Sequence, residues 1–447
     1  MSSSDNPEPT PAFLLSGCAG TLSSEAHEAT VVFDVSVDRF GKVTVLFQPL
    51  ALTADTAWLL KPSFPGDLAI PRLRVTGIAP AGEHVSSDAV YILSAGTPQK
   101  DGVAYLDIRG QAEPLRVAYP PLSEPHARRH VSYRTVGMRG GPGTASSQAP
   151  EGKVWIAGPH IPRDYAAIHG AIDIETTEDR PLPEWLTSCD ELASRVRDIF
   201  SLGQGRFIQQ SVRELYLDEK LVQLDFYGPK SSTEPYQPVF HHLNRQPVLD
   251  LAVQSYTPAL QNERGLGIAI EWLLMHPNYT EGKYLTAFAA LEHLLAVNGK
   301  HIPTTILSPD TFKASVLRHL ANALDEARKA LPDASTEAFA MLRGKLDNLN
   351  QRPLTVRLTT LLKHLQVPTT DIDDRIPAAL RARNHLLHRG RYTDDKPLYQ
   401  HLTVLREVVV RFILTMLAFQ GSYESYLCDP TWGSFPPATK TTPHADA

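Results

Sequence analysis

The sequence is poor in cysteine, with only Cys18, Cys189 and Cys428 in 447 residues. Their number is odd and they lie far apart, so they form neither a disulfide framework nor a Cys-x-x-Cys metal site. Long apolar runs are absent too, because no segment reaches the roughly 18 uninterrupted apolar residues typical of a membrane span. The first residues lack the basic start and apolar stretch of a signal peptide. We therefore expect a cytoplasmic protein without a membrane segment.

A strong excess of positive charge is missing as well, since the formal net charge is −6. The chain as a whole is therefore not a general nucleic-acid binder, and any RNA contact must be a local basic patch with salt-sensitive affinity. One segment, between residues 375 and 396, has that composition. Its cations are Arg375, Arg381, Arg383, Arg389, Arg391 and Lys396.

The chain is too long for one ordinary hydrophobic core, so two or three domains are expected. Residues 1–12 are polar and rich in proline, which predicts a disordered tail. Over residues 13–248, short runs of β-branched and aromatic residues alternate with turn residues. The runs at residues 30–37 and 42–47, for example, are typical of a β-hairpin. We predict a β-rich N-terminal domain over residues 13–248 that is sandwich-like or partly closed.

From about residue 249 the apolar residues recur with the period of a helix. One earlier helix is predicted within the β-rich region, over residues 183–202. The later helices are predicted over residues 263–275, 278–298, 309–329, 337–349, 356–365, 377–389 and 402–419. Residues 429–447 are rich in Pro, Thr and Ala, which predicts a second disordered tail. The predicted fold class is therefore α+β and multidomain, with an all-α bundle over residues 249–428 after the β-rich domain.

A glycine-rich stretch precedes the middle of the chain, with five glycines between Gly137 and Gly152. It superficially resembles a phosphate-binding loop. However, its lysine is followed by Val154, where a P-loop has Ser or Thr, so the pattern fails. We interpret the stretch as a surface loop.

The predicted helix Pro377–Arg389, followed by Gly390 as a suitable C-cap, carries a cation that packing alone does not require. At about 100° per residue, Arg383 lies at the centre of an apolar stripe. The stripe consists of Ala379, Leu380, Leu386 and Leu387. A guanidinium among leucines is costly unless an anion or several acceptors meet it. Two interpretations stay open: an arginine paired with a carboxylate while His388 caps the helix, or a site for an anion.

Asn384 and His388, four residues apart, share the edge of that stripe. The pattern Arg383-Asn384-x-x-x-His388 resembles the Arg-polar-x3-His signature of HEPN-domain ribonucleases, and the basic turn Arg389-Gly390-Arg391 follows it. The predicted helix 278–298, which carries Glu292, is similar to the first helix of that domain. The helical run 402–419 follows the motif as in the family. The resemblance covers residues 280 to 425.

A β-rich region in front of such a helical domain is similar in layout to the ApeA-type anti-phage proteins. The resemblance implies an endoribonuclease that acts in abortive infection on cytoplasmic RNA such as tRNA. It also implies that the β-rich domain is a sensor or regulator of the nuclease. A phage-derived trigger is then an expected partner of that domain.

RNA is cut without a metal when its 2′-OH attacks the adjacent phosphate and a cyclic phosphate results. The step needs a base, an acid and positive charge near the phosphate. We assign proton transfer to His388, phosphate binding to Arg383 and orientation to Asn384. The expected RNA-binding residues are Arg381, Arg389 and Arg391. No cofactor is expected and no metal site is predicted, because no histidine lies in a His-Glu-x-x-His or Cys-x-x-Cys context.

Glu292 is interpreted as an ion partner that holds Arg383 in place, and its structural alternative is a carboxylate at the edge of two packed helices. One motif supplies a single histidine for two proton transfers. HEPN ribonucleases solve this by pairing two domains so that two motifs line one cleft. We therefore expect a homodimer whose interface includes the helix Pro377–Arg389.

Two other functions stay open at this point. A catalytically inactive HEPN module would bind a nucleotide or a protein and use the motif for dimer packing. A sugar-binding β sandwich with a helical appendage has only the number of strands in its favour. RNA degradation that depends on His388 distinguishes the nuclease from both.

Overall fold

The computed structural model describes residues 12–53, 56–60, 72–120, 128–138, 145–158, 167–228, 236–241, 243–275, 277–331, 336–389, 391–392, 397–427 and 430–437. Residues 1–11 of the predicted N-terminal tail lie outside this description. The chain divides into two compact units, Met1–Thr257 and Pro258–Ala447. Strands make up most of the first unit and helices most of the second, which confirms the α+β class. The first unit extends past residue 248, because α2 (Arg245–Asp250) and η2 (Leu251–Ser255) belong to it.

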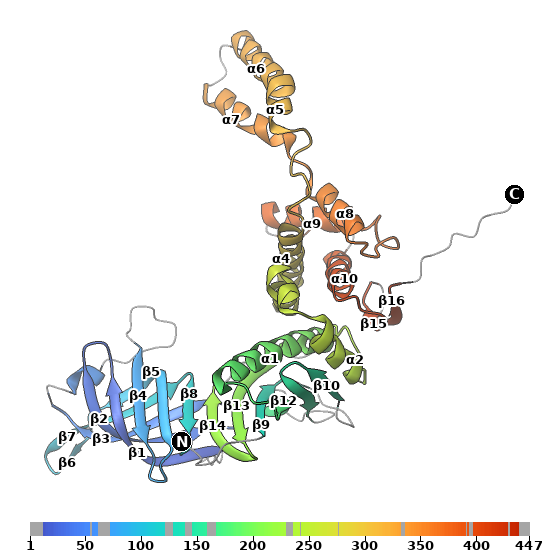
Figure 1. Cartoon of the computed structure of the whole chain (residues 1–447). Coiled ribbons are helices and arrows are strands. Elements are labelled where there is room, and N and C mark those ends of the chain that lie inside the picture. The colour runs from blue at the N-terminus through green and yellow to red at the C-terminus, as the bar shows by residue number, and fades with distance from the viewer. Residues whose placement is uncertain are drawn as a thin grey trace, which may run out of the picture. The chain divides into compact units, whose positions relative to one another are not determined.

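Fourteen strands, counted over the described residues, pair into one antiparallel sheet in the first unit (Figure 1). They are β1 (Phe13–Ser23), β2 (Glu28–Val37), β3 (Val43–Ala51), β4 (Leu73–Ile78), β5 (His84–Gly96), β6 (Gln99–Lys100), β7 (Val103–Ala112), β8 (Leu115–Ala118), β9 (Arg129–Val136), β10 (Ala145–Ala149), β11 (Gly152–Ala157), β12 (Ile168–Thr176), β13 (Gln209–Leu217) and β14 (Lys220–Phe226). Their order is β10-β11-β12-β9-β13-β14-β8-β5-β4-β1-β2-β3-β7-β6.

One additional pairing changes the shape of this sheet. Strand β5 also pairs with β7, so that β1, β2, β3, β7, β5 and β4 close into a ring. The open part of the sheet extends from β5 of the ring and consists, in order, of β8, β14, β13, β9, β12, β11 and β10. The predicted sandwich-like packing stays a prediction, since what the pairings establish is one antiparallel sheet that partly closes on itself.

The predicted hairpin at residues 30–47 is confirmed as β2 and β3, with Val37 paired to Val43. Along β2 every second side chain is buried, and these residues are Ala29, Val31, Phe33, Val35 and Val37. This period of two puts one apolar face into the core of the ring. Each large apolar side chain buried there contributes about 1.5–3 kcal/mol relative to exposure.

Strands β1 and β10 are among those that lie where the sequence predicts none. Strand β1 contains Gly17 and Gly20, which weaken its pattern, yet a Cβ at Gly20 would lie 1.9 Å from the carbonyl oxygen of Thr76 on β4. The close approach of these strands therefore requires glycine. Strand β10 falls within the predicted surface loop 137–152, so that prediction is wrong for Ala145–Ala149. Its buried residues are alanines and a serine, which give no apolar signal.

Helix α1 (Leu182–Gln204) confirms the helix predicted over residues 183–202 and lies across one face of the open sheet (Figure 1). It contacts β9 and β12. Trp185, Leu192 and Val196 are fully buried on its inner side. Tyr133 of β9 donates a hydrogen bond of 2.8 Å to Asp190 on the helix. The opposite face of the open sheet is not covered by this helix.

Helices form nearly all of the second unit. They are η3 (Ala259–Glu263), α3 (Leu266–Leu274), α4 (Thr280–Asn298), α5 (Pro309–Phe312), η4 (Lys313–Leu317), α6 (Arg318–Ala330), α7 (Thr336–Leu346), η5 (Asp347–Asn350), α8 (Leu354–His364), α9 (Ile376–Arg389) and α10 (Leu398–Met416). Helix α10 is the central one, because every residue from His401 to Leu414 is buried. It packs against α3, α4 and α9. Over the described parts of both units, no helix has the length and apolarity needed to cross a membrane.

The central helix α10 carries a buried network of charged side chains. The Arg411 guanidinium lies against Asp371 through two contacts of 2.5 and 2.9 Å, and its Nε is 2.8 Å from Glu407. Tyr423 donates a hydrogen bond of 2.8 Å to the same Glu407 carboxylate. Arg411 is 2% exposed and Glu407 4%. Each buried charge therefore has a partner, as burial in a packed interior requires.

The predicted disordered tail over residues 429–447 is wrong for its first part. Strand β16 (Thr431–Phe435) pairs with β15 (Gly421–Ser425) in an antiparallel hairpin after α10. Phe435 is buried and packs against Phe419 and Tyr423, with ring centroids 6.3 and 5.7 Å away. These aromatic contacts hold a short segment in place, and the Pro-, Thr- and Ala-rich sequence around it hides its strand character. Residues 438–447 lie outside the described residues.

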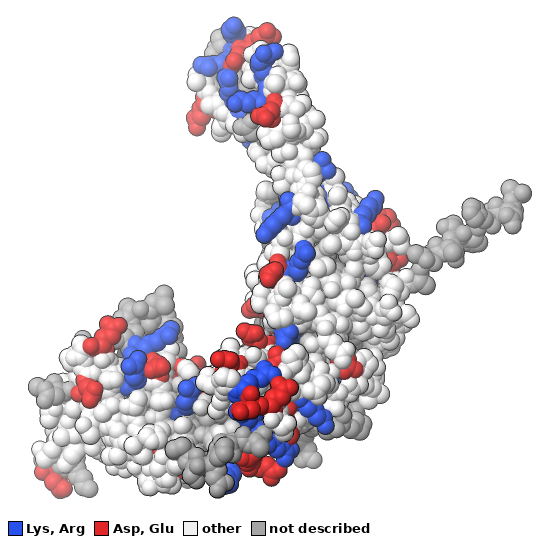
Figure 2. Space-filling model, in the orientation of Figure 1, with Lys and Arg blue, Asp and Glu red and all other residues white. Residues whose placement is uncertain are grey.

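Helices α5, α6 and α7, with η4 and η5, form an excursion between α4 and α8. Its two ends are joined, because Thr305 and Gln351 form an antiparallel bridge. The Asn350 side chain also accepts from the Leu307 N–H at 2.8 Å and donates to its carbonyl at 3.0 Å. On the face shown in Figure 2, positive and negative side chains are mixed over this excursion. Leu349 is 56% exposed there.

Tyr284 of α4 provides a pH-dependent test of the second unit. It is fully buried, and its hydroxyl donates a hydrogen bond of 2.6 Å to the carbonyl of Ala379 on α9. Burial raises the pKa of this phenol above its ordinary value. The folded state thus favours the neutral phenol. The contribution of Tyr284 to the free energy of unfolding is therefore complete below pH of about 10 and falls as the pH rises above that value.

We expect Tyr284→Phe to lower the free energy of unfolding by about 1 kcal/mol at neutral pH. The difference between wild type and variant should shrink above pH of about 10, by up to about 1.4 kcal/mol per pH unit. Urea unfolding at a series of pH values measures this difference. A difference that grows with alkalinity would contradict the stated direction.

Candidate functional site

Helix α9 carries the candidate motif and is confirmed within one residue of its predicted start. It buries Ile376, Ala379, Leu380, Ala382 and Leu386. These side chains are turned toward the helices that α9 contacts, which are α4, α8 and α10. The helix is thereby anchored along one side. Gly390, the predicted C-cap, lies outside the described residues.

The other side of α9 presents the polar residues of the motif. Arg381, Asn384 and His388 are three and four residues apart, which places them on one helical face. All three are exposed. Leu387 is 55% exposed and lies beside them, so the predicted apolar stripe is wrong at this position. The reason is that the packed helices cover only the side of α9 that holds Leu380 and Leu386.

Arg383 lies between the buried and the exposed side of the helix. Its side chain is 36% exposed, and its guanidinium carbon is 5.0 Å from the centre of the Phe288 ring on α4. Glu292, one turn further along α4, has a carboxylate oxygen 3.7 Å from Nη2 of Arg383. This distance is longer than a hydrogen bond, so the carboxylate orients the cation without taking all of its donors.

The pair of Arg383 and Glu292 contributes little to stability, because both side chains are more than one third exposed. A cation next to an aromatic face adds about 0.5–1 kcal/mol at such sites. The two interactions orient the guanidinium but contribute little to the stability of the fold. Arg383 can therefore still receive a further anion from the solvent side.

The basic patch predicted around the motif divides into two sets. Arg381, Arg389 and Arg391 are exposed. Arg375, in contrast, donates a hydrogen bond of 3.3 Å to the carbonyl of Leu427 and has a structural partner. Lys396 lies outside the described residues. The exposed set agrees with the three arginines that the sequence proposes as RNA-binding residues, and whether they bind RNA stays a prediction.

A group of aromatic side chains beside the motif was not predicted. The ring of Tyr392 lies between those of His385 on α9 and His401 on α10, with centroid distances of 5.8 and 5.6 Å. His401 is buried. These contacts hold the chain after α9 against the central helix, next to Arg391. No regular spacing in the sequence links these three residues.

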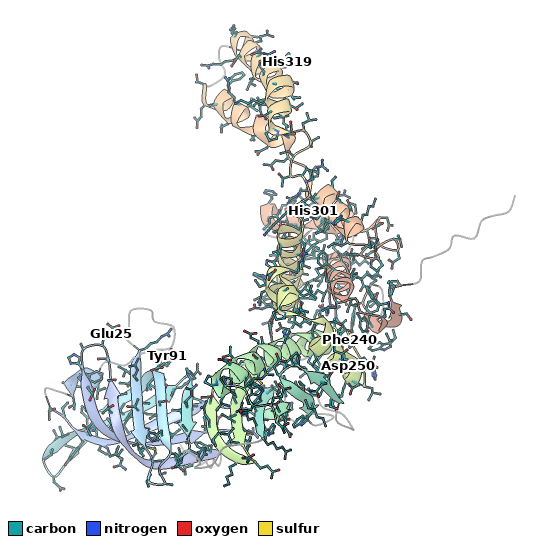
Figure 3. All side chains as sticks on the ribbon, viewed as in Figure 1. Glu25, Tyr91, Phe240, Asp250, His301 and His319 are labelled. Carbon is teal, nitrogen blue, oxygen red and sulfur yellow. The ribbon has the colours of Figure 1, made fainter. Side chains whose placement is uncertain are left out.

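Among the described residues, no three side chains of the kinds that bind metals come together. A pair of histidines lies just after α4 and at the end of α8. The rings of His301 and His364 have centroids 4.3 Å apart. Figure 3 marks His301 at this place and His319 on α6. A pair of imidazoles without a third ligand is short of the donor set of a structural metal site.

Comparison with known proteins returns no match to a family model, a curated protein or a solved structure. The residues of α9, their geometry and the resemblance of the motif are therefore what indicates a function.

Proposed function

We propose that the chain is a metal-independent endoribonuclease of the HEPN type that acts in anti-phage defence by cleaving cytoplasmic RNA such as tRNA. The observation that supports this most is the exposed face of α9. It presents Arg381, Asn384 and His388 together, while Glu292 and Phe288 orient Arg383 at its edge. In this proposal α4, α9 and α10 are the core of a HEPN bundle. The β-rich unit is the sensor for a phage-derived trigger.

The proposed reaction uses side chains only. His388 removes the proton from the 2′-OH or donates one to the leaving 5′ oxygen, because histidine exchanges protons near neutral pH. Arg383 binds the non-bridging oxygens with its planar group of donors. Asn384 orients the phosphate or the imidazole one turn away. The 2′ oxygen forms a bond to phosphorus, and the bond from phosphorus to the 5′ oxygen breaks. The products are an RNA end with a 2′,3′-cyclic phosphate and an RNA end with a free 5′-OH.

Two proton transfers need two partners, and each copy of the motif contributes one such histidine at the exposed face. We therefore propose a homodimer in which two copies of α9 line one cleft. The exposed Leu387 is consistent with this, because it is an apolar side chain beside Asn384 and His388. An apolar residue in that position would be covered in a dimer.

Leu387→Glu tests this arrangement. We expect the variant to be monomeric and to lose most RNA cleavage, because a charge would be buried at the interface. Leu349→Glu is the matched control, since Leu349 is 56% exposed and Leu387 55%. Light scattering gives the mass, and an RNA cleavage assay gives the activity. A Leu387→Glu variant that remains dimeric and active would contradict the proposed interface.

Removal of divalent metals tests the chemistry. We expect cleavage to continue in excess EDTA at a rate within about twofold of the untreated enzyme, since the proposed groups are side chains. The cleaved ends should carry cyclic phosphates. Loss of activity in EDTA, with recovery on addition of Mg²⁺ or Mn²⁺, would contradict the mechanism.

The alternative is a catalytically inactive HEPN module that binds a nucleotide or a protein. One observation favours this alternative. The contacts of Arg383 with Glu292 and Phe288 would be expected equally if the arginine only joined α9 to α4. In that case the wild-type protein would bind RNA or nucleotide without producing new RNA ends. Sequencing of RNA ends from cells that express the protein separates the two functions.

A further inference from the structure

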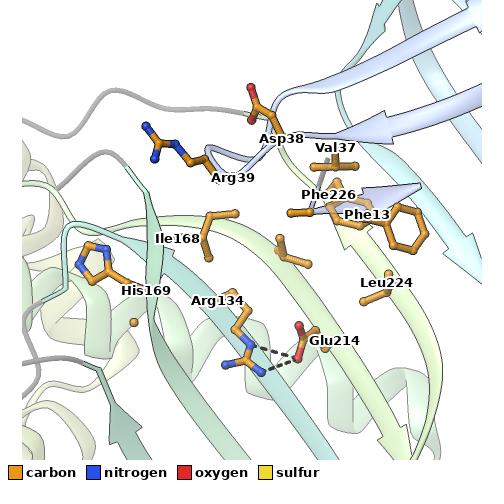
Figure 4. Close-up of a pocket in the computed structure, with 13 residues that line it drawn as sticks. Phe13, Val37, Asp38, Arg39, Arg134, Ile168, His169, Glu214, Leu224 and Phe226 are labelled. Carbon is orange, nitrogen blue, oxygen red and sulfur yellow. Dashed lines mark hydrogen bonds and ion pairs between the residues drawn. The ribbon is translucent and has the colours of Figure 1, made fainter. Parts of the chain in front are cut away.

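The open part of the sheet in the first unit has two ends that differ. Where it meets the ring, side chains from both parts surround a cavity of about 410 Å³, and the Glu214 carboxylate lies 3.1 Å from Arg134 (Figure 4). The N–H of Ile168 on β12 also donates to the carbonyl of Arg39 in the turn between β2 and β3. At the other end lies β10, which pairs only with β11 among the described residues.

Strand β10 is therefore an edge strand. Such a strand presents N–H and C=O groups with which another strand can pair, and proteins usually protect it with a charged residue, a proline or a very short length. At the opposite end of the sheet order, β6 has only two residues. The sequence of β10, Ala-Ser-Ser-Gln-Ala, has neither a charge nor a proline. Protection of this edge must come from outside the strand.

The side chain of Gln246 on α2 occupies this edge. Its Oε1 accepts a hydrogen bond of 3.0 Å from the N–H of Ser146, and its Nε2 donates one of 2.8 Å to the carbonyl of Ser146. A carboxamide has the same donor and acceptor as a peptide group. The glutamine thus makes the two hydrogen bonds that a neighbouring strand would make with Ser146.

The amide of Gln246 is held in this position. Both carboxylate oxygens of Asp250, one turn later on α2 and labelled in Figure 3, lie 3.0 Å from its Nε2. Helix α2 contacts α1 and β10 and buries Val248 and Leu249. Gln246 itself is exposed to solvent. Its substitution should therefore leave the packing of α2 intact.

A second copy of the chain is the strand that fits this edge. Backbone groups two residues apart point to the same side of a strand, so those of Gln148 face outward like those of Ser146. A twofold antiparallel pairing of two β10 strands would set Ser146 of each copy opposite Gln148 of the other, with Ser147 at the axis. Each such pair exchanges two hydrogen bonds. Both pairs need the groups of Ser146 that Gln246 occupies.

We propose that Gln246 is an autoinhibitory contact, which keeps the edge of β10 from pairing with β10 of a second copy of the chain. Helix α2 begins the segment that leads to Pro258, where the second unit starts. Displacement of α2 would withdraw Gln246 and open the edge, so the first unit could then self-associate through its sheet. This proposal does not depend on the nuclease.

Gln246→Ala in the full chain tests the proposal. The variant should self-associate with a dissociation constant about tenfold lower than that of wild type, because the two backbone groups of Ser146 become available. Light scattering over a range of concentrations measures the mass relative to that of wild type. Gln246→Met, which keeps the length of the side chain without its amide, should behave in the same way. Unchanged association of both folded variants would overturn the proposal.

Two substitutions of Gln148 locate the pairing. Gln148→Ala is the matched control, because it removes an exposed glutamine from the same edge and leaves Gln246 in place, so its mass should equal that of wild type. Gln148→Pro added to Gln246→Ala removes an outward N–H, and proline is tolerated in edge strands, so the mass should return to that of wild type. Circular dichroism verifies each fold. Continued association of this double variant would overturn the assignment to β10.

Discussion

His388→Ala should reduce the rate of RNA cleavage by a factor of about 10²–10⁴, the range expected for loss of one general acid or base. The loss would be larger if both copies of a dimer contribute to one site. The substitution removes an exposed side chain at the last turn of α9. We therefore expect the thermal midpoint and the molecular mass to match those of wild type. Toxicity on overexpression should disappear together with cleavage.

His319→Ala is the matched control for this experiment. His319 is an exposed histidine on helix α6 of the same unit, outside the motif (Figure 3). The control should cleave RNA like wild type. Sequencing of RNA ends in cells that express each variant would show the target as well as the loss. If the His388→Ala protein produced the same RNA ends as the control, the nuclease proposal would fail.

Arg411→Met should lower the free energy of unfolding of the helical unit by about 3–5 kcal/mol, the cost of removing one partner from a buried ion pair. The arginine is 2% exposed and Glu407 4%, so the carboxylate would be left buried without its cation. Asp371 would lose its two contacts at the same time. We expect a lower urea midpoint for the transition in which the helical signal is lost.

Arg343→Met is the control for the buried network, because Arg343 forms an ion pair with Asp325 in which both side chains are at least half exposed. Such pairs contribute about 0–1 kcal/mol, so its urea midpoint should change little. A double variant, Arg411→Met with Glu407→Met, should recover part of the loss by removing the stranded charge. Equal midpoints for Arg411→Met and Arg343→Met would contradict the account of α10.

The local sequence was sufficient to predict the helices and strands whose apolar residues repeat regularly. Helix α9, helix α1 and the hairpin of β2 and β3 lie where the sequence predicts them, because each has a repeating apolar face. Strand β1 was not predicted because its glycines interrupt the apolar pattern. Gly20 is needed for the close approach of β4, which the sequence of β1 alone does not reveal. Strand β16 was missed because its order comes from Phe419 and Tyr423, outside its own segment.

The residues of the candidate site could be predicted from the sequence, but the helices that cover or expose them could not. A helical period puts Asn384 and His388 on one side of α9, and the structure agrees with it. Which side would be open depends on the neighbouring helices, and for that reason the exposure of Leu387 could not be foreseen. The group formed by His385, Tyr392 and His401 joins residues whose spacing follows no motif.

The bridge between Thr305 and Gln351 has a consequence for how this protein can change over evolutionary time. Paired backbones in an antiparallel ladder are about 5 Å apart, so the segment between these residues begins and ends at almost the same point. Lengthening or trimming that segment leaves the separation of α4 and α8 unchanged, and the entropic cost grows only slowly with loop length. The bundle can thus acquire new surface there while its core residues stay where they are.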